Sequence, residues 1–362
     1  MNRRISRLRI GTLTLAAALF GTGLATAQTP PAKAADDTPE IKIGSTIFAD
    51  YTYQSKPEAV DADGNTYKPS SFNVTRTYIN FNGKLSHRFA FRITPDITRD
   101  NGNDSINGSY VFRLKYGFGQ FNLDDWTTKG SWIRFGQTQT PYIDYIESAY
   151  AYRFQGPVFV DREGFLTSSD LGVSGRWVFP GNYGDVMGGI YNGEGYGHTE
   201  KNNQKSLQAR VSYRPLPQSA ALKGLRFAAF YDADNYLENA KKDRFVVNAT
   251  YVSSWGHAGL EYLTAKDQAS SLLPTVDSRG WSAWITPRFT PTWGALLRHD
   301  QVKPDTDTDA KKSRNIAGIA YWIPLEKVTS AIMADYETVS YDNYTASKPD
   351  ETRFGIHMLI NF

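Results

Sequence analysis

Apolar and polar residues alternate with a period of two along many segments of this chain. Around position 210, for example, Leu207, Ala209 and Val211 alternate with Gln208 and Arg210. A helix would need apolar residues three and four positions apart, which these segments lack. Segments of about 10 to 14 residues with a period of two are typical of tilted β-strands that cross a membrane.

The alternation predicts sixteen strands, and therefore an all-β fold. An even number suits an antiparallel up-and-down transmembrane β-barrel whose two ends lie on the same side of the membrane. The predicted strands are Ile41–Tyr53, Ser71–Lys84, His87–Thr98, Ser109–Leu123, Ser131–Thr140, Ser169–Phe179, Asp185–Gly195, Gln204–Arg214, Gly224–Tyr236, Lys242–Ser254, His257–Asp267, Asp277–Thr290, Thr292–Lys303, Lys312–Leu325, Thr329–Asp342 and Glu351–Phe362.

The connections between these segments alternate in length. Short turns such as Pro180–Tyr183 and Glu326–Val328 are separated by longer polar stretches such as Gln54–Ser70 and Pro141–Ser168. Short inner turns and long outer loops are typical of outer-membrane barrels. Pro215–Lys223 departs from the pattern, because it is long for an inner turn.

The two ends of the chain also fit an outer-membrane protein. Four arginines precede the apolar run Ile10–Ala25, and Ala25-Thr26-Ala27 fits a signal-peptide cleavage site. We therefore predict a signal peptide over residues 1–27, a short leader over 28–40 and the barrel over 41–362. The chain ends on Phe362, which closes an amphipathic strand.

Composition narrows the remaining possibilities. No segment after the signal region reaches the roughly 20 apolar residues of a spanning helix. The chain has no cysteine, which excludes a disulfide scaffold, and its formal charge of +3 does not suggest nucleic-acid binding. Aromatic residues make up 14% of the chain, and aromatic girdles at two membrane interfaces would accommodate them.

Three stretches resemble the phosphate-selective, O/P-type porin family. Arg76–Leu85 followed by Phe89–Arg92 is similar to the second hairpin of that family, Ile133–Tyr142 to the strand that leads into its constriction loop, and Gly172–Gly175 to the strand that returns from it. The resemblance implies a sixteen-stranded barrel, a trimer and a third outer loop that folds inward. It does not extend to the residues that bind phosphate in that family.

If the apolar face of each strand meets lipid, the alternate face lines a water-filled lumen. That face is predicted to be basic, with fewer acids, namely Asp50, Asp232, Glu261, Asp335 and Glu337. Such a wall would concentrate anions. Alternatively, the arginines pair with the acids and only brace the wall. The residues predicted for the anion pathway are Arg92, Arg113, Lys115, Arg134, Arg176, Arg210 and Arg298.

The longest connection, Pro141–Ser168, is the candidate constriction loop. Its aromatic residues suit packing inside a barrel better than exposure to solvent. We expect Tyr150, Tyr152, Arg153 and Arg162 to lie at the constriction. Alternatively, the loop packs on a neighbouring subunit.

These features predict an outer-membrane porin that passes small solutes, preferably anions such as phosphate. The expected partners are those solutes, outer-membrane lipid and lipopolysaccharide, and two further copies of the chain. A general or sugar-selective porin remains an alternative, with Trp132 and Trp284 stacking on sugar rings, and so does a structural or adhesin-type barrel. The five histidines are scattered and accompany no nucleophile motif, so no enzyme activity, metal or cofactor is predicted.

Overall fold

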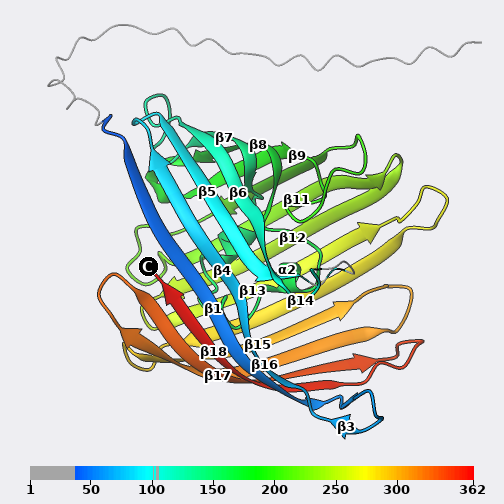
Figure 1. Cartoon of the computed structure of the whole chain (residues 1–362). Coiled ribbons are helices and arrows are strands. Elements are labelled where there is room, and N and C mark those ends of the chain that lie inside the picture. Colours follow the sequence, from blue (N-terminus) through cyan, green and yellow to red (C-terminus); the bar gives the residue numbers. More distant parts are fainter. Residues whose placement is uncertain (1–36, 101, 103–105) are drawn as a thin grey trace, which may run out of the picture. The chain divides into compact units, whose positions relative to one another are not determined.

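The computed structural model describes residues 37–100, 102 and 106–362. Within these residues, sixteen antiparallel strands form one closed barrel (Figure 1). The predicted signal peptide lies outside the described residues, as does most of the predicted leader. No helix in the described part of the chain is long and apolar enough to span a membrane.

The sixteen barrel strands follow one another around the ring in sequence order. Their bounds are β1 (Glu40–Lys56), β4 (Ser70–Lys84), β5 (Phe89–Arg99), β6 (Tyr110–Asn122), β7 (Trp132–Gln139), β8 (Ser169–Val178), β9 (Gly184–Tyr191), β10 (Ser206–Tyr213), β11 (Leu225–Leu237), β12 (Ala240–Ser253), β13 (Gly256–Asp267), β14 (Val276–Pro287), β15 (Trp293–Lys303), β16 (Lys311–Pro324), β17 (Thr329–Asp342) and β18 (Glu351–Asn361).

The first and last strands close the ring. Strand β1 pairs with β4 on one side and with β18 on the other, both antiparallel, and Figure 1 shows β1 in blue beside β18 in red. The backbone amide of Phe362 donates to the carbonyl of Ser45 at 3.0 Å, and the amide of Ser45 donates back to Phe362 at 3.0 Å. Because closure pairs both edges, the sixteen described strands leave no row of unpaired amides at a sheet edge.

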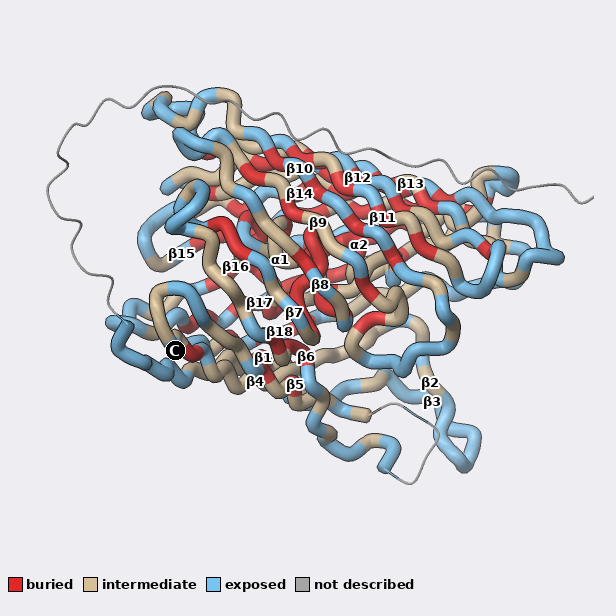
Figure 2. The backbone as a smooth tube through the Cα atoms, turned by 90° about the horizontal axis from the view of Figure 1, so that it is seen from above, coloured by how far each residue is buried: buried red, intermediate tan, exposed pale blue. Residues whose placement is uncertain are grey.

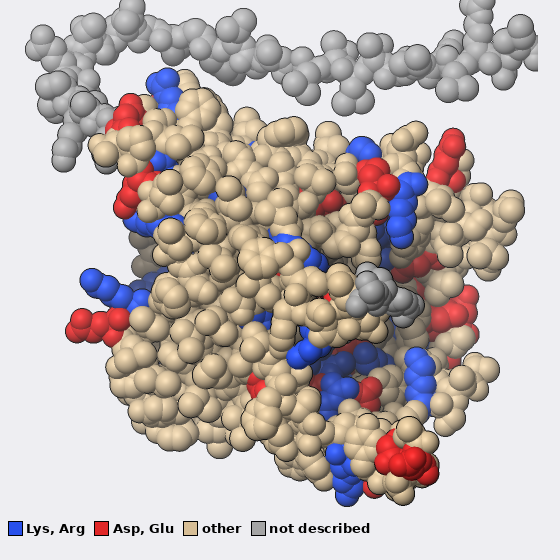
Figure 3. All heavy atoms as spheres, viewed as in Figure 1, with Lys and Arg blue, Asp and Glu red and all other residues tan. Residues whose placement is uncertain are grey.

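The predicted alternation is visible as alternating burial. In strand β10 buried and exposed residues alternate strictly, and Figure 2 shows the same alternation along β10 to β13. The exposed positions are apolar: Phe72 is 82% exposed and Phe135 is 73% exposed. Figure 3 shows a broad, mostly uncharged outer face with charged side chains at its ends and in a hollow.

The strand predictions are confirmed, with differences at a few ends. Strand β17 has the predicted bounds, whereas β9 ends at Tyr191 instead of Gly195. The chain turns away there because Gly193 adopts a φ of 111° and donates its amide to Asp170. The outer stretch Gln54–Ser70 also contains a small hairpin that was not predicted, formed by β2 (Ala59–Val60) and β3 (Thr66–Tyr67).

The alternation of connection lengths is less strict than predicted. Strands β11 and β12 are joined on the outer side by a turn of only Glu238 and Asn239, in which Asn239 has a φ of 63°. Asparagine tolerates this left-handed conformation better than most residues, which permits the tight reversal. The neighbouring inner connection, which includes Pro215–Lys223, is long, as the sequence indicated.

Candidate channel interior

The loop between β7 and β8 contains two short helices, α1 (Ile143–Glu147) and α2 (Phe159–Arg162). Buried side chains of the barrel wall hold its backbone. Arg210 of β10 donates to the carbonyl of Pro141 at 2.7 Å, and Arg298 of β15 donates to the carbonyl of Pro157 at 2.8 Å. These contacts attach the loop to separate parts of the wall.

Aromatic side chains pack the loop against the same wall. The ring of Tyr150 meets that of Trp284 edge to face, with centroids 5.3 Å apart. Tyr152 stacks on Phe154 and meets Trp322 edge to face. Tyr150 and Tyr152 are each 1% exposed, so neither presents a ring to a passing solute.

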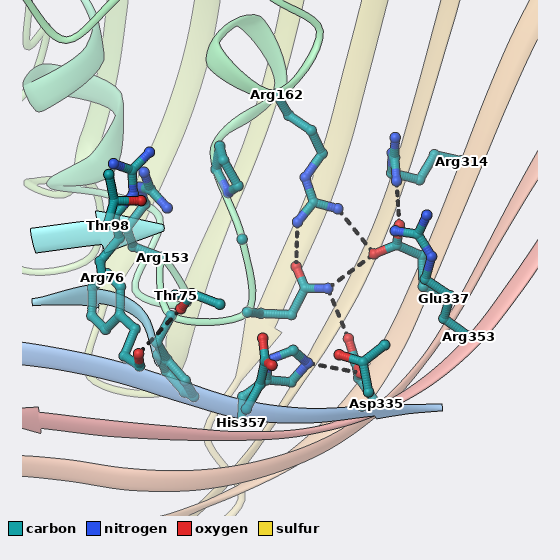
Figure 4. A pocket seen from close by; sticks show the side chains of 18 residues that line it. Thr75, Arg76, Thr98, Arg153, Arg162, Arg314, Asp335, Glu337, Arg353 and His357 are labelled. Carbon is teal, nitrogen blue, oxygen red and sulfur yellow. Dashed lines mark hydrogen bonds and ion pairs between the residues drawn. The ribbon is translucent and has the colours of Figure 1, made fainter. Parts of the chain in front are cut away.

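A pocket of about 440 Å³ lies between the tip of the loop and strands β1, β4, β5, β16, β17 and β18; we call it the loop-tip pocket (Figure 4). Arg76 and Arg153 lie on one side of it, and Arg162, Arg314 and Arg353 lie on the other. The loop itself contributes Arg153–Pro157 and Arg162.

Gln155 connects the loop tip to β17. Its side-chain amide donates to Asp335 at 2.7 Å and to Glu337 at 3.2 Å, and its carbonyl accepts from Arg162 at 3.0 Å. Arg162 also donates to Glu337 at 3.0 Å, and His357 Nε2 lies 3.0 Å from Asp335 (Figure 4). The tip is therefore bound to the wall by a continuous polar network.

Every arginine of the loop-tip pocket is ion-paired. Arg153 lies 2.6 Å from Glu147, and Arg162 lies 3.0 Å from Glu337. The remaining pairs are Arg76–Asp96, Arg314–Glu337 and Arg353–Glu351. At this level of the barrel the arginines brace the wall, as the alternative interpretation of the sequence held.

A second pocket, of about 300 Å³, lies between the base of the loop and strands β7 to β11; we call it the loop-base pocket. Arg176 and Arg210 share one carboxylate there, since each lies 2.7 Å from Asp185. Arg134, Arg214 and Arg226 also line this pocket, and no carboxylate of the described residues lies within 4.0 Å of them. Basic charge in excess of acidic charge is therefore found at the base of the loop.

The other residues predicted for the anion pathway are distributed over the wall. Arg92 donates to Asn80 at 2.8 Å and lies over the ring of Tyr116. Lys115 is 6% exposed, and its ammonium lies 4.5 Å from the ring centroid of Tyr78. Of the predicted pathway residues, Arg134, Arg176 and Arg210 share the loop-base pocket.

Arg113 and Arg298 are ion-paired. Arg113 lies 3.0 Å from Asp96, and Arg298 lies 2.7 Å from Asp300 in a pair that is almost fully buried. Arg298 therefore supports the loop and presents no free charge to a solute.

Sequence reasoning missed several acids on the buried face. Asp96, Asp185 and Asp300 are each at most 5% exposed and bind arginines. The period of two could have indicated these acids. Asp300 lies two positions after Arg298, and Asp96 lies two positions after Thr94, so each acid shares the buried face of its strand with the earlier residue. Gln155 carried no comparable signal, since nothing in an irregular loop indicates which side chain reaches β17.

Comparison with models of known protein families finds no match, and no curated protein sequence matches the chain. Solved structures do match. The anion-selective porin from Comamonas acidovorans aligns with a TM-score of 0.62 at 11% identity, over 90% of this chain and 99% of that chain.

Two further structures align similarly. The trimer form of OmpT from Vibrio cholerae has a TM-score of 0.58 at 12% identity, over 90% of this chain and 100% of that chain. The outer-membrane channel DcaP of Acinetobacter baumannii has a TM-score of 0.58 at 13% identity, over 91% of this chain and 99% of that chain. The chain thus has the fold of outer-membrane porins and channels.

Proposed function

We propose that the protein is an outer-membrane porin, a water-filled diffusion channel with a preference for small anions. One observation carries the proposal: a closed barrel with an apolar exposed face and a polar, charged buried face. Lipid can cover the first face, and only water or polar solutes suit the second.

Exposed aromatic side chains near one end of the barrel support a location in a membrane. Near its short-turn end, Trp177, Tyr213, Trp255 and Trp293 expose between 46% and 52% of their surface. Aromatic side chains of this kind gather where a bilayer meets water. We propose the outer membrane as the location, a homotrimer as the assembly, and lipid and lipopolysaccharide as its surroundings.

In this proposal the loop 141–168 narrows the channel. Arg153 and Arg162 line the loop-tip pocket, whereas Tyr150 and Tyr152 fix the loop to the wall. Anion preference follows from the arginines of the loop-base pocket that form no ion pair within the described residues, namely Arg134, Arg214 and Arg226. Phosphate is one anion of suitable charge and size, which accords with the O/P-type resemblance of the sequence.

A sugar-selective channel has less support. Trp132 is covered by the guanidinium of Arg134, 3.7 Å from its ring centroid, and Trp284 packs against Tyr150. Neither ring offers a free face for stacking on a sugar.

Reversal potentials across planar bilayers in a potassium chloride gradient test the proposal. We expect discrete conductance steps and a reversal potential of the sign that chloride permeation gives. Folded protein that produces no conductance steps would contradict a diffusion channel, and a potential of the opposite sign would contradict anion preference alone.

A further inference from the structure

The loop-base pocket combines three cationic side chains that lack acidic partners. Arg134 donates to the side chains of Gln120 and Gln139, Arg214 donates to Asn182 at 3.2 Å, and Arg226 makes no ion pair within the described residues. Guanidinium groups that share a partly desolvated pocket repel one another unless an anion lies between them.

Two donors at this pocket have no partner of their own. Arg226 Nε and the hydroxyl of Tyr145 are both buried atoms without a hydrogen bond. Both residues line the pocket, one from β11 and one from α1 of the loop. Buried donors nearly always find an acceptor, and one oxyanion in this pocket could accept from both of them.

The two carboxylates at the pocket cannot fill this role. Asp185 is engaged by Arg176 and Arg210 and by the hydroxyl of Ser212. Asp144 accepts a hydrogen bond from the hydroxyl of Tyr116 at 3.0 Å, and among the described residues it forms no ion pair with an arginine of this pocket. The excess of positive charge therefore remains.

We infer that the loop-base pocket is a binding site for a small oxyanion such as inorganic phosphate, held by Arg214 and Arg226 with Arg134 and the hydroxyl of Tyr145 at its edge. A tetrahedral or planar oxyanion suits the fork geometry of guanidinium groups and accepts from a hydroxyl as well. This inference deepens the proposed function, because it places anion capture on the short-turn side of the loop, where β10 ends and β11 begins, and leaves the loop-tip pocket neutralised.

Binding of inorganic phosphate to the purified barrel in detergent tests the site without any need for conductance. The readout is broadening of the phosphate ³¹P resonance as protein is added. The test variant is Arg214→Gln with Arg226→Gln. The matched control is Arg288→Gln, which removes one charge near the same end of the barrel from a residue that stacks on Trp322 and does not line this pocket.

We expect the wild type and Arg288→Gln to bind phosphate, and the double variant to bind it about tenfold or more weakly, since charged hydrogen bonds are lost. The variant Arg214→Lys with Arg226→Lys should retain part of the affinity. Heat-modifiable migration of each variant verifies that the barrel has folded.

Equal affinity in the double variant and the wild type would overturn the site, as would absence of phosphate binding in the wild type or an equal loss in Arg288→Gln. Conductance is a separate measurement: a chain that binds phosphate but forms no channel keeps the site and loses the proposed function.

Discussion

Single side chains determine how firmly the loop 141–168 is held. Gln155 is 7% exposed and bridges Arg162 to Asp335 and Glu337. Because its amide both donates and accepts, no charged residue of similar size satisfies all three neighbours. Gln155 therefore fixes both the position of the tip and the pairing of the charges around it.

Replacing Gln155 by Leu should loosen the tip. The substitution keeps much of the volume but removes three hydrogen bonds, which costs roughly 1–3 kcal/mol where charged groups are left unsatisfied. We expect larger and noisier single-channel currents than in the wild type, and unfolding of the barrel at a lower denaturant concentration. Gln155→Asn, which keeps the amide on a shorter stem, is the control; currents unchanged in both variants would contradict a role in holding the loop.

A second residue-scale prediction concerns the inner turn before β5. Asp37 Oδ1 accepts from the backbone amide of His87 at 2.8 Å and lies 2.6 Å from His87 Nδ1. The hydrogen bond with Asp37, and then that with Asp125, raises the pKa of His87. A raised pKa in the folded state means that the contact stabilises below the ordinary pKa of histidine and is lost as pH rises through the raised value.

Titration of the His87 ring protons by NMR checks this link. We expect a midpoint above the usual value of about 6.5 in the wild type, and a lower midpoint in Asp37→Asn. Because the hydrogen bond with Asp37 contributes most to the raised pKa of His87, Asp37→Asn should lower the ring midpoint more than Asp125→Asn does. An unchanged midpoint in Asp37→Asn would refute the assigned cause.

At the scale of elements, the sequence predicted the strands well because each carries its own period of two. Strand β17 is an example in which every second residue is buried over most of its length. The ion pairs were not predictable in the same way. Asp96 of β5 binds both Arg76 of β4 and Arg113 of β6, and that contact depends on the register of three strands.

The lipid-facing side of one element gives a direct test of the alternation. Ile356 is 54% exposed near the middle of β18 and should lie near the centre of the bilayer. Ile356→Lys should destabilise the barrel by about 2 to 4 kcal/mol in lipid vesicles, as a lysine on the lipid face at the midplane does.

The matched control places the same charge on the opposite face. Thr98 of β5 lines the loop-tip pocket, so Thr98→Lys should cost much less. Equilibrium unfolding by denaturant measures both changes. Equal destabilisation by the two lysines would mean that the exposed and buried faces do not meet lipid and water as proposed.

At the scale of the whole molecule, the charges of the barrel separate into two levels. The arginines of the loop-tip pocket are paired, and the excess lies in the loop-base pocket, where five arginines face two aspartates. Solutes passing the loop would meet balanced charge first and unbalanced charge behind it. The proposed selectivity for anions should therefore arise from the electric field of the arginines in the loop-base pocket, which salt can screen. The width of the channel at the loop should contribute little.

This arrangement predicts that the proposed anion preference depends strongly on ionic strength. The Debye length falls from about 30 Å at 0.01 M salt to about 3 Å at 1 M, so the field of Arg214 and Arg226 should reach across the lumen only at low salt. We expect the ratio of anion to cation permeability, measured from reversal potentials, to fall steadily as salt rises. The same ratio in Arg214→Gln with Arg226→Gln should start lower and change less. A permeability ratio that stays constant from low to high salt in the wild type would contradict this prediction. Anions would then have to be selected by direct contact at the loop tip. There the ion pairs of Arg153 and Arg162 would have to open for each passing ion.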